Sequence, residues 1–441
     1  MPSAKGPQHI LVDCGVTKGK SGQGDIATIK SAVRHMARET KYKLALIVVT
    51  HRHQDHIVGF SRCADEFAKF EVGAIWMPYW ETEYAAKVSK FQEELEAVAF
   101  NLGVAALAAN PNELTQEILG IVENATGVSA TEGPGGGSNA KSLDLLKTQL
   151  GVKPQYLAKG DRPKLPPALV AAGLGADVLG PPPEDDFAFL KLMDLKKGSG
   201  QYFGNASAIS KADKAGRLRP FGPEFIAKAT DYPPRAFNEF APRGVEGTDY
   251  KQRYAEQLEQ AARAATPDAM FRAAKALDAL LNNQSLVVLF TWNDKKLLFA
   301  GDAQAGNWEY WLYDLDKPIK DPSEETLGDD GKDILSSLDF YKVGHHGSTN
   351  ATPRAAVEAM GNEFVSMCSV EEGVFGKKEN ESEVPRTPLL TALGKKSTLV
   401  RSDQFPVAVE GIKLPAAVRR KIGKPKRGKL VVGSCFVDYL L

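Results

Sequence analysis

The sequence predicts an α/β fold, and three observations indicate this class. Residues 9–14, 26–40 and 44–49 read as strand, helix and strand, an order that produces a parallel strand pair. Apolar runs bounded by turn residues return in the second half of the chain, from about residue 285. Between these regions, residues 81–125 have the composition of helices. We therefore expect a sheet built from two distant parts of the sequence, with a large helical segment between them.

The first elements follow from short-range patterns. His9–Cys14 (HILVDC) reads as a short strand, and Gly15 ends it. In residues 26–40 the apolar side chains recur every three or four positions, as in an amphipathic helix. Leu44–Val49 is an uninterrupted apolar run, typical of a buried strand, and Glu71–Tyr79 is expected to be the next strand.

After residue 80 the spacing departs from a compact α/β pattern. Residues 81–125 and 251–282 are predicted to be helical, with a short helix at 141–149. Gly133–Ser138 reads as a flexible linker and residues 176–179 as one further strand.

The expected domain organisation is a core interrupted by an insertion. We assign residues 1–80 and 281–441 to the core, with some further core strands within 150–195. Residues 81–280 are expected to form a mostly helical insertion, and we consider two roles for it, a lid and a partner-docking surface.

The second half of the sheet is clearer than the first. Ser285–Thr291 and Lys296–Ala300, joined by four turn residues, read as a hairpin. The remaining expected elements are strands at 338–343 and 363–370, a helix at 353–360 and a last strand at 429–432.

Composition describes an ordinary globular chain without a disulfide framework. The 441 residues carry 55 basic and 55 acidic side chains, so no net charge selects acidic or basic partners. The four cysteines form no CxxC pair, which fits a reducing compartment. Because no apolar run approaches the ~20 residues that cross a bilayer and no secretory signal is recognisable, we expect a cytoplasmic protein without a membrane partner.

Histidines and aspartates gather at the predicted strand ends. The N-terminal cluster is His51, His53, Asp55 and His56, and the C-terminal cluster is His345 and His346. Asp302 follows a glycine at a third strand end. Since imidazole and carboxylate suit zinc and its first-row neighbours, we expect these groups to share metal ions. A purely structural role for the cluster is the alternative.

The pattern HxHxDH at 51–56, a later Gly-Asp at 301–302 and a late strand-end histidine resembles the metallo-β-lactamase superfamily. The segments LNNQSLVVLFTWNDKKLLFAGDA and DFYKVGHHGS resemble more closely the metallo-β-lactamase-like domain of bacterial DNA-uptake competence proteins and their soluble relatives. The resemblance covers residues 9–80 and 280–441. It implies the αββα sandwich of that superfamily, carrying the large helical insertion.

The resemblance also implies a set of metal ligands. His51 and His53 are expected to hold one metal, Asp55 and His56 the second, and Asp302 to bridge both. His345 is expected to complete the second site, with His346 behind it or acting as a proton donor; the reverse assignment is the alternative. The cofactors implied are two divalent ions, Zn²⁺ first and Mn²⁺ second. Familiar hydrolases of this superfamily have a further histidine ligand that this chain lacks, and the candidates to replace it are Asn282, Asn283 and Ser285.

The function implied is a dinuclear phosphodiesterase, in particular a nuclease, that uses a hydroxide bridging the two metals. Asp55 would orient the hydroxide, and His346 or Lys342 would protonate the leaving group. Two alternatives remain open: a hydrolase of thioesters, lactones or lactams on the same fold, and a metal-stabilised module that binds a partner through residues 81–280.

A basic run near the C-terminus adds a candidate nucleic-acid contact. Eight basic residues and no acid lie between Lys413 and Lys429. Neutralising phosphates is the sequence-independent part of nucleic-acid binding, although such runs are usually only solvated. The residues proposed for this contact are Arg419, Arg420, Lys421, Lys424, Lys426 and Arg427.

Overall fold

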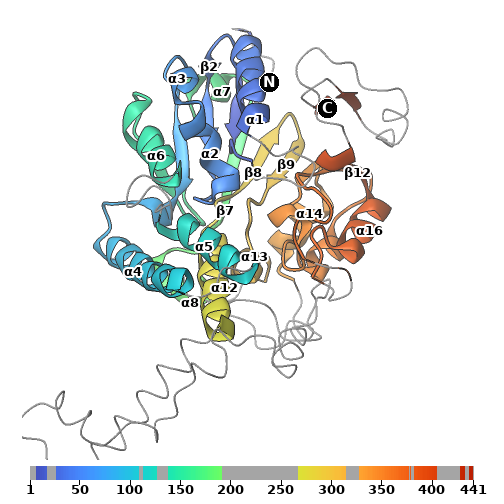
Figure 1. Cartoon of the computed structure of the whole chain (residues 1–441). Coiled ribbons are helices and arrows are strands. Elements are labelled where there is room, and N and C mark those ends of the chain that lie inside the picture. The colour runs from blue at the N-terminus through green and yellow to red at the C-terminus, as the bar shows by residue number, and fades with distance from the viewer. Residues whose placement is uncertain are drawn as a thin grey trace, which may run out of the picture. The chain divides into compact units, whose positions relative to one another are not determined.

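A computed structural model describes the fold over most of the chain (Figure 1). The described residues are 6–16, 26–108, 113–126, 138–190, 267–313, 327–376, 378, 382–404, 428–432 and 437–440. The chain divides into two compact units. The first unit is Met1–Glu96, Glu123–Asn205 and Ala276–Leu441, and the second is Ala97–Val122 and Ala206–Lys275.

A four-stranded parallel sheet is built from the N-terminal part of the first unit. Its strands, in spatial order, are β1 (Ile10–Val12), β3 (Leu46–Val48), β5 (Ile75–Pro78) and β6 (Gln155–Leu157). Ile10 pairs with Leu46, Ile47 with Ile75 and Trp76 with Gln155. The predicted parallel pair of the first two core strands is therefore present. Beside this sheet, β2 (Lys43–Leu44) and β4 (Glu71–Val72) form a short parallel pair.

A six-stranded mixed sheet contains the C-terminal strands. The order is β12 (Ser397–Arg401), β11 (Phe364–Cys368), β10 (Phe340–Lys342), β9 (Lys295–Phe299), β8 (Val287–Trp292) and β7 (Leu174–Gly180). The pairs from β12 to β9 are parallel, whereas β8 is antiparallel to both β9 and β7. The predicted hairpin is thus β8–β9. A separate antiparallel pair joins β13 (Lys429–Val432) to β14 (Val437–Leu440).

One buried cluster takes side chains from both large sheets. Leu46, Val48 and Trp76 of the four-stranded sheet pack in it with Val178 and Val288 of the six-stranded sheet. The two sheets therefore pack against each other through one face each.

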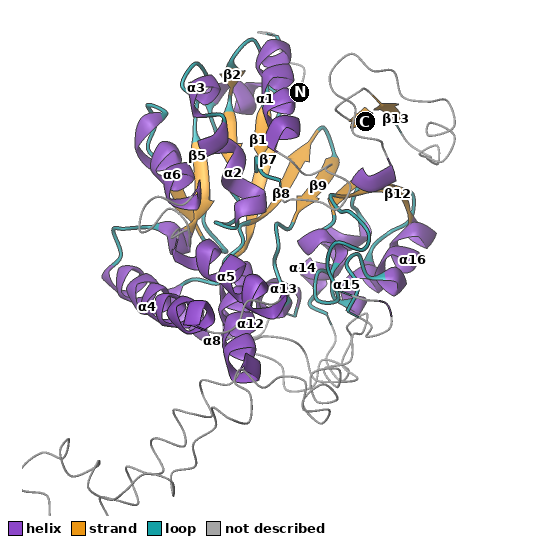
Figure 2. Ribbon diagram, viewed as in Figure 1, coloured by secondary structure: helices purple, strands orange, loops and turns teal. Residues whose placement is uncertain are grey.

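The opposite faces of the two sheets are covered by helices (Figure 2). The helices over the four-stranded sheet are α1 (Ile26–Thr40), α2 (Gln54–Arg62), α3 (Ala64–Phe67) and α6 (Ser138–Asp144), with the adjoining π-helix Leu145–Gln149. Those over the six-stranded sheet are α13 (Ala305–Leu312), α14 (Asp329–Ser336), α15 (Arg354–Ala359) and α16 (Thr387–Lys396). Helices, sheet, sheet and helices follow one another through the first unit.

The remaining elements are mostly helical. They are α4 (Ala86–Ala108), α5 (Glu113–Thr126), α7 (Pro167–Ala171), α8 (Phe187–Leu190), α12 (Pro267–Asn283) and the short 3-10 turns Tyr79–Glu81, Glu184–Asp186, His345–Gly347 and Ser402–Gln404. Within the second unit, Lys275 Nζ lies 2.7 Å from Glu117 Oε1. In the described part of the chain no helix is both long and apolar enough to cross a bilayer.

These elements confirm the predicted α/β class, with parallel and antiparallel strands in the same molecule. The strands β6 and β7 lie within residues 150–195, where further strands were expected. The boundaries expected for the insertion, 81–280, remain a prediction, and its predicted helix at 251–282 is described only from Pro267.

Candidate metal centre

The His51–His56 segment lies where β3 gives way to α2. The strand ends at Val48, and His53 takes the extended cap position before the first helical residue, Gln54. Asp55 stands in the first turn of α2, where the helix dipole favours a carboxylate. The exposed fractions of His51, His53 and His56 are 1%, 5% and 9%. This corner of the fold therefore buries three imidazoles within six residues.

Asp302 reaches the same place from the turn after β9. Gly301 before it has a φ of +54°, and a Cβ there would meet the Thr50 Cβ at 2.7 Å, so this turn requires glycine. The Asp302 N–H donates to Ser285 Oγ (3.1 Å), and the His345 N–H donates to Asp302 Oδ1 (3.0 Å). These two hydrogen bonds fix a carboxylate that is only 3% exposed.

The first group consists of His51, His53 and Asp302, whose donor atoms lie within 4.8 Å of one another. His51 Nε2 is 3.9 Å from Asp302 Oδ2, and the two imidazole centroids are 4.5 Å apart. Both histidine Nε2 atoms are buried and have no hydrogen-bond partner among the described residues. Because a buried polar atom without a partner costs free energy, a cation fits this position.

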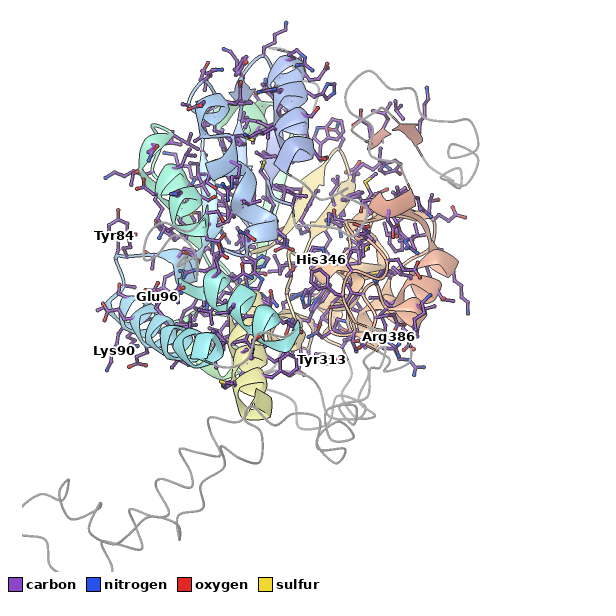
Figure 3. The ribbon with its side chains drawn as sticks, viewed as in Figure 1. Tyr84, Lys90, Glu96, Tyr313, His346 and Arg386 are labelled. Atoms are coloured by element: carbon purple, nitrogen blue, oxygen red, sulfur yellow. The ribbon has the colours of Figure 1, made fainter. Side chains whose placement is uncertain are left out.

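The second group consists of Asp55, His56, Asp302 and His346, again within 4.8 Å of one another. His56 Nε2 lies 3.2 Å from Asp302 Oδ1, and His346 Nε2 lies 2.6 Å from Asp55 Oδ2 and 3.6 Å from Asp302 Oδ2. Figure 3 labels His346, which lies where the N-terminal part of the ribbon meets the C-terminal part. Asp302 thus belongs to both groups, as expected for a bridging carboxylate.

The structure differs from the sequence expectation at the histidine pair, because His346, rather than His345, lies among the second group. His345 and His346 both have positive φ angles, +41° and +52°, so the chain turns sharply after β10. The turn directs His345 Nδ1 to Ser348 Oγ (2.8 Å) and Asn350 Oδ1 (3.1 Å). His346 Nδ1 is instead 2.8 Å from the Ser369 carbonyl, which leaves Nε2 facing the carboxylates.

Asp13 supports the second group, and sequence reasoning missed it. Its Oδ2 lies 2.7 Å from His56 Nδ1, and it accepts hydrogen bonds from the Thr50 N–H and hydroxyl at 2.7 Å each. A carboxylate on the far nitrogen of a ligand imidazole fixes the tautomer and ring orientation. The available signal was an aspartate directly after the first strand and two residues before Gly15. The structure explains that glycine, because a Cβ at position 15 would collide with the Asp55 backbone.

The two groups differ in electrostatics. Burial, reinforced by the neighbouring imidazoles, lowers the pKa of His51 well below the ordinary value, and burial also lowers the pKa of His53. Burial opposes the charge of His56 and His346 too, but Asp302 and the neighbouring carboxylates outweigh it and raise both pKa values. Although burial disfavours its charge as well, the pKa of Asp302 is well below its ordinary range because His56 and His346 lie beside it.

The backbone of the histidine motif is held by a buried ion pair. Arg52 Nε and Nη2 donate to the two carboxylate oxygens of Glu81 at 2.6 and 2.9 Å, and the two side chains are only 9% and 2% exposed. Arg52 Nη1 also donates to the Ala125 carbonyl (3.0 Å) and lies 3.7 Å from Glu96, labelled in Figure 3. Asn139 Nδ2 donates to the Arg52 carbonyl (2.9 Å). Side chains from the expected insertion therefore position the loop between His51 and His53.

The other predicted site residues have other contacts or lie outside the described residues. Ser285 and Asn283 are buried, and Asn283 Oδ1 accepts a hydrogen bond from the Asn307 N–H (3.1 Å). Asn282 Nδ2 is 3.4 Å from Asp278 Oδ2, and Lys342 Nζ is 3.5 Å from the Val343 carbonyl. All six basic residues proposed for nucleic-acid contact, from Arg419 to Arg427, lie outside the described residues.

Comparisons of the chain with models of protein families, with curated proteins and with solved structures give no significant match. The centre is therefore characterised by its own donors. It is a buried cluster of histidines and aspartates compatible with metal binding, and it offers two overlapping donor groups. Imidazole nitrogen and carboxylate oxygen are donors that zinc and its first-row neighbours accept.

Proposed function

We propose that the chain is a dinuclear metal-dependent hydrolase of the metallo-β-lactamase superfamily, and that its substrates are phosphodiesters. The observation that carries the proposal is the sharing of Asp302 by two His/Asp groups. The spatial order of the layers in the first unit is helices, sheet, sheet and helices, and it agrees with the αββα sandwich that the motifs imply.

Two divalent cations in such a centre supply Lewis acidity and lower the pKa of a water molecule toward neutrality. The residues of the chain have separate tasks around them. Asp302 offers one oxygen toward His51 and both toward the second group, so a single carboxylate serves both positions. His346 belongs to the ligands in this assignment. His345, held by Ser348 and Asn350, is then the imidazole left to donate a proton to a leaving group.

The phosphodiester preference rests on the motif resemblance and on the basic run near the C-terminus. Two cations held close together favour in-line displacement at phosphorus, since they neutralise both the attacking and the leaving oxygen. Nucleic acid is therefore the first substrate class to test. Thioesters, lactones and lactams form the second, because the same nucleophile attacks a carbonyl.

The test combines metal quantitation with a substrate panel. The purified chain is loaded with Zn²⁺, Mn²⁺ or Mg²⁺ and assayed on bis(p-nitrophenyl) phosphate, single-stranded DNA and RNA, a thioester and a chromogenic lactam. We expect metal-dependent turnover of phosphodiesters that falls by more than about 10³-fold in His51→Ala and Asp302→Ala. Asp177→Asn, which changes an exposed aspartate of β7, serves as the control.

Each other outcome assigns the protein differently. Turnover confined to the thioester or lactam would move it to the second substrate class. Two bound metals without any turnover would contradict the enzymatic proposal, and fewer than one metal per chain would leave a partner-binding module.

A further inference from the structure

The first group is short of one donor. It contains three donor residues, whereas the second group contains four, and zinc in proteins is almost always four-coordinate. The chain has no histidine between His56 and His345 that could supply the missing donor. The Ser285 hydroxyl already accepts the hydrogen bond from the Asp302 N–H.

Asp278 lies beside the open side of this group. It is on α12, near the C-terminal end of the helix, and its Oδ1 is 3.9 Å from His53 Nε2. That distance is too long for a hydrogen bond, and in the part of the chain that the structure describes His53 Nε2 is a buried nitrogen without a hydrogen-bond partner. Two donors at ~2.1 Å from one tetrahedral cation stand ~3.4 Å apart, so a small side-chain movement would allow both to share a cation.

The contacts of Asp278 leave the relevant oxygen available. Asn282, one helical turn further along α12, places its Nδ2 3.4 Å from Asp278 Oδ2, whereas Oδ1 is the atom facing His53. The Asp278 side chain is 19% exposed, so it lies at the edge of the buried centre. Charge also favours it, since Asp278 would add a further carboxylate beside the proposed pair of dications.

We propose that Asp278 is the fourth protein donor of the first group and replaces the histidine that this chain lacks. The inference rests on the proposed dinuclear centre and deepens it. It also gives the expected insertion, residues 81–280, a role in the chemistry, because Asp278 belongs to it. Neither a lid nor a docking partner is needed for that role.

The experiment measures metal binding directly. The metal-free full chain is titrated with Zn²⁺ by calorimetry, and Co²⁺ absorption spectra report the geometry of each occupied position. In Asp278→Asn we expect two binding events to separate, with one affinity falling by about 10–100-fold while the other stays within about twofold. Asp278→Glu should recover most of the loss, and Asp177→Asn, on an exposed position, should match the unmodified chain.

The comparison with His51→Ala identifies the affected position. If the inference is correct, Asp278→Asn and His51→Ala weaken the same binding event and change the same Co²⁺ bands, whereas His346→Ala weakens the other. Two unchanged affinities in Asp278→Asn would overturn the inference and leave the dinuclear centre intact. An unmodified chain that binds no metal would overturn both.

Discussion

The two donor groups share Asp302 but differ in burial and charge. The side chains of His51 and His53 are 1% and 6% exposed, whereas those of Asp55 and His346 are 21% and 25% exposed. The first group therefore lies deeper and is dominated by neutral imidazoles. The second lies nearer the surface and pairs two imidazoles with two carboxylates.

This difference separates the tasks of the two groups. A deep position with little access is suited to holding a cation permanently, because solvent and substrate do not compete for it. A partly exposed position with mixed charge can admit a substrate oxygen. We therefore expect the second group to face the substrate and the first to anchor the centre.

The largest effect is expected at the shared residue. Asp302→Ala should remove both metal positions and lower hydrolysis to background, because both groups lose the carboxylate that they share. His51→Ala and His346→Ala should each remove one metal and leave the other. Metal content by inductively coupled plasma mass spectrometry checks this. Equal stoichiometries in Asp302→Ala and His51→Ala would mean that Asp302 does not bridge.

The next largest effect is expected from breaking the buried Arg52–Glu81 ion pair, which holds the loop between His51 and His53. Glu81→Gln should destabilise the fold by about 3–5 kcal/mol, since it leaves Arg52 buried and without its bidentate partner. Burial opposes charge on Glu81, but Arg52 outweighs it and lowers the pKa of that carboxyl. Zn²⁺ binding should weaken at the first group before the second, because Arg52 stands between His51 and His53.

Chemical denaturation with a matched surface pair tests the role of burial. Arg354 and Glu358 form an ion pair at 2.6 Å whose side chains are 61% and 60% exposed. Glu358→Gln should change the free energy of unfolding by less than about 1 kcal/mol.

The double variant Arg52→Met/Glu81→Met should lose less stability than the sum of the losses in Arg52→Met and Glu81→Met. Strictly additive losses would mean that the pair does not couple.

Sequence patterns indicated most of the histidines and aspartates of the two groups, because short-range features of the chain determine where these residues lie. His51, His53 and Asp55 follow a buried strand within a few residues, so their convergence needs only a strand-to-helix corner. Asp302 could be predicted from a glycine that marks a strand-end turn. The sequence could not show which of His345 and His346 faces the carboxylates, because two successive positive φ angles determine the direction of each ring.

Long-range contacts account for what the sequence did not indicate. Arg52 and Glu81 are 29 positions apart, and no sequence motif or periodicity indicates that they form an ion pair. Asp278 lies in a helix whose composition is otherwise ordinary, and only the fold brings it 3.9 Å from His53. The strand β12 begins and ends with a polar residue, and its parallel pairing with β11 defines it rather than its own hydrophobic pattern.

A smaller and selective effect is expected from Asp13. Asp13→Asn should weaken metal binding at the second group by about 10–100-fold, because Asp13 orients His56 through Nδ1. Calorimetric titration should show a smaller change at the first group, to which Thr50 connects Asp13. An equal loss at both groups would show that Asp13 supports the whole corner and not one ligand.

The least pronounced difference is expected in the response to pH. In the metal-free chain the lowered pKa values of His51 and His53 favour their neutral forms, whereas the raised pKa values of His56 and His346 favour their protonated forms. We therefore expect metal binding to displace more protons from the second group than from the first. As pH falls toward 6, the affinity of the second group should therefore decrease by up to about tenfold per unit for each proton released, and the first group should keep its metal to lower pH.

Calorimetry in two buffers of different ionisation enthalpy counts the protons released at each binding event. More protons should accompany the event that His346→Ala removes than the event that His51→Ala removes. His35, outside both groups, provides the control, since His35→Gln should leave both proton counts unchanged. Equal release from the two events, or earlier loss of metal from the first group in acid, would mean that the carboxylates do not divide the centre into a neutral and a protonated half.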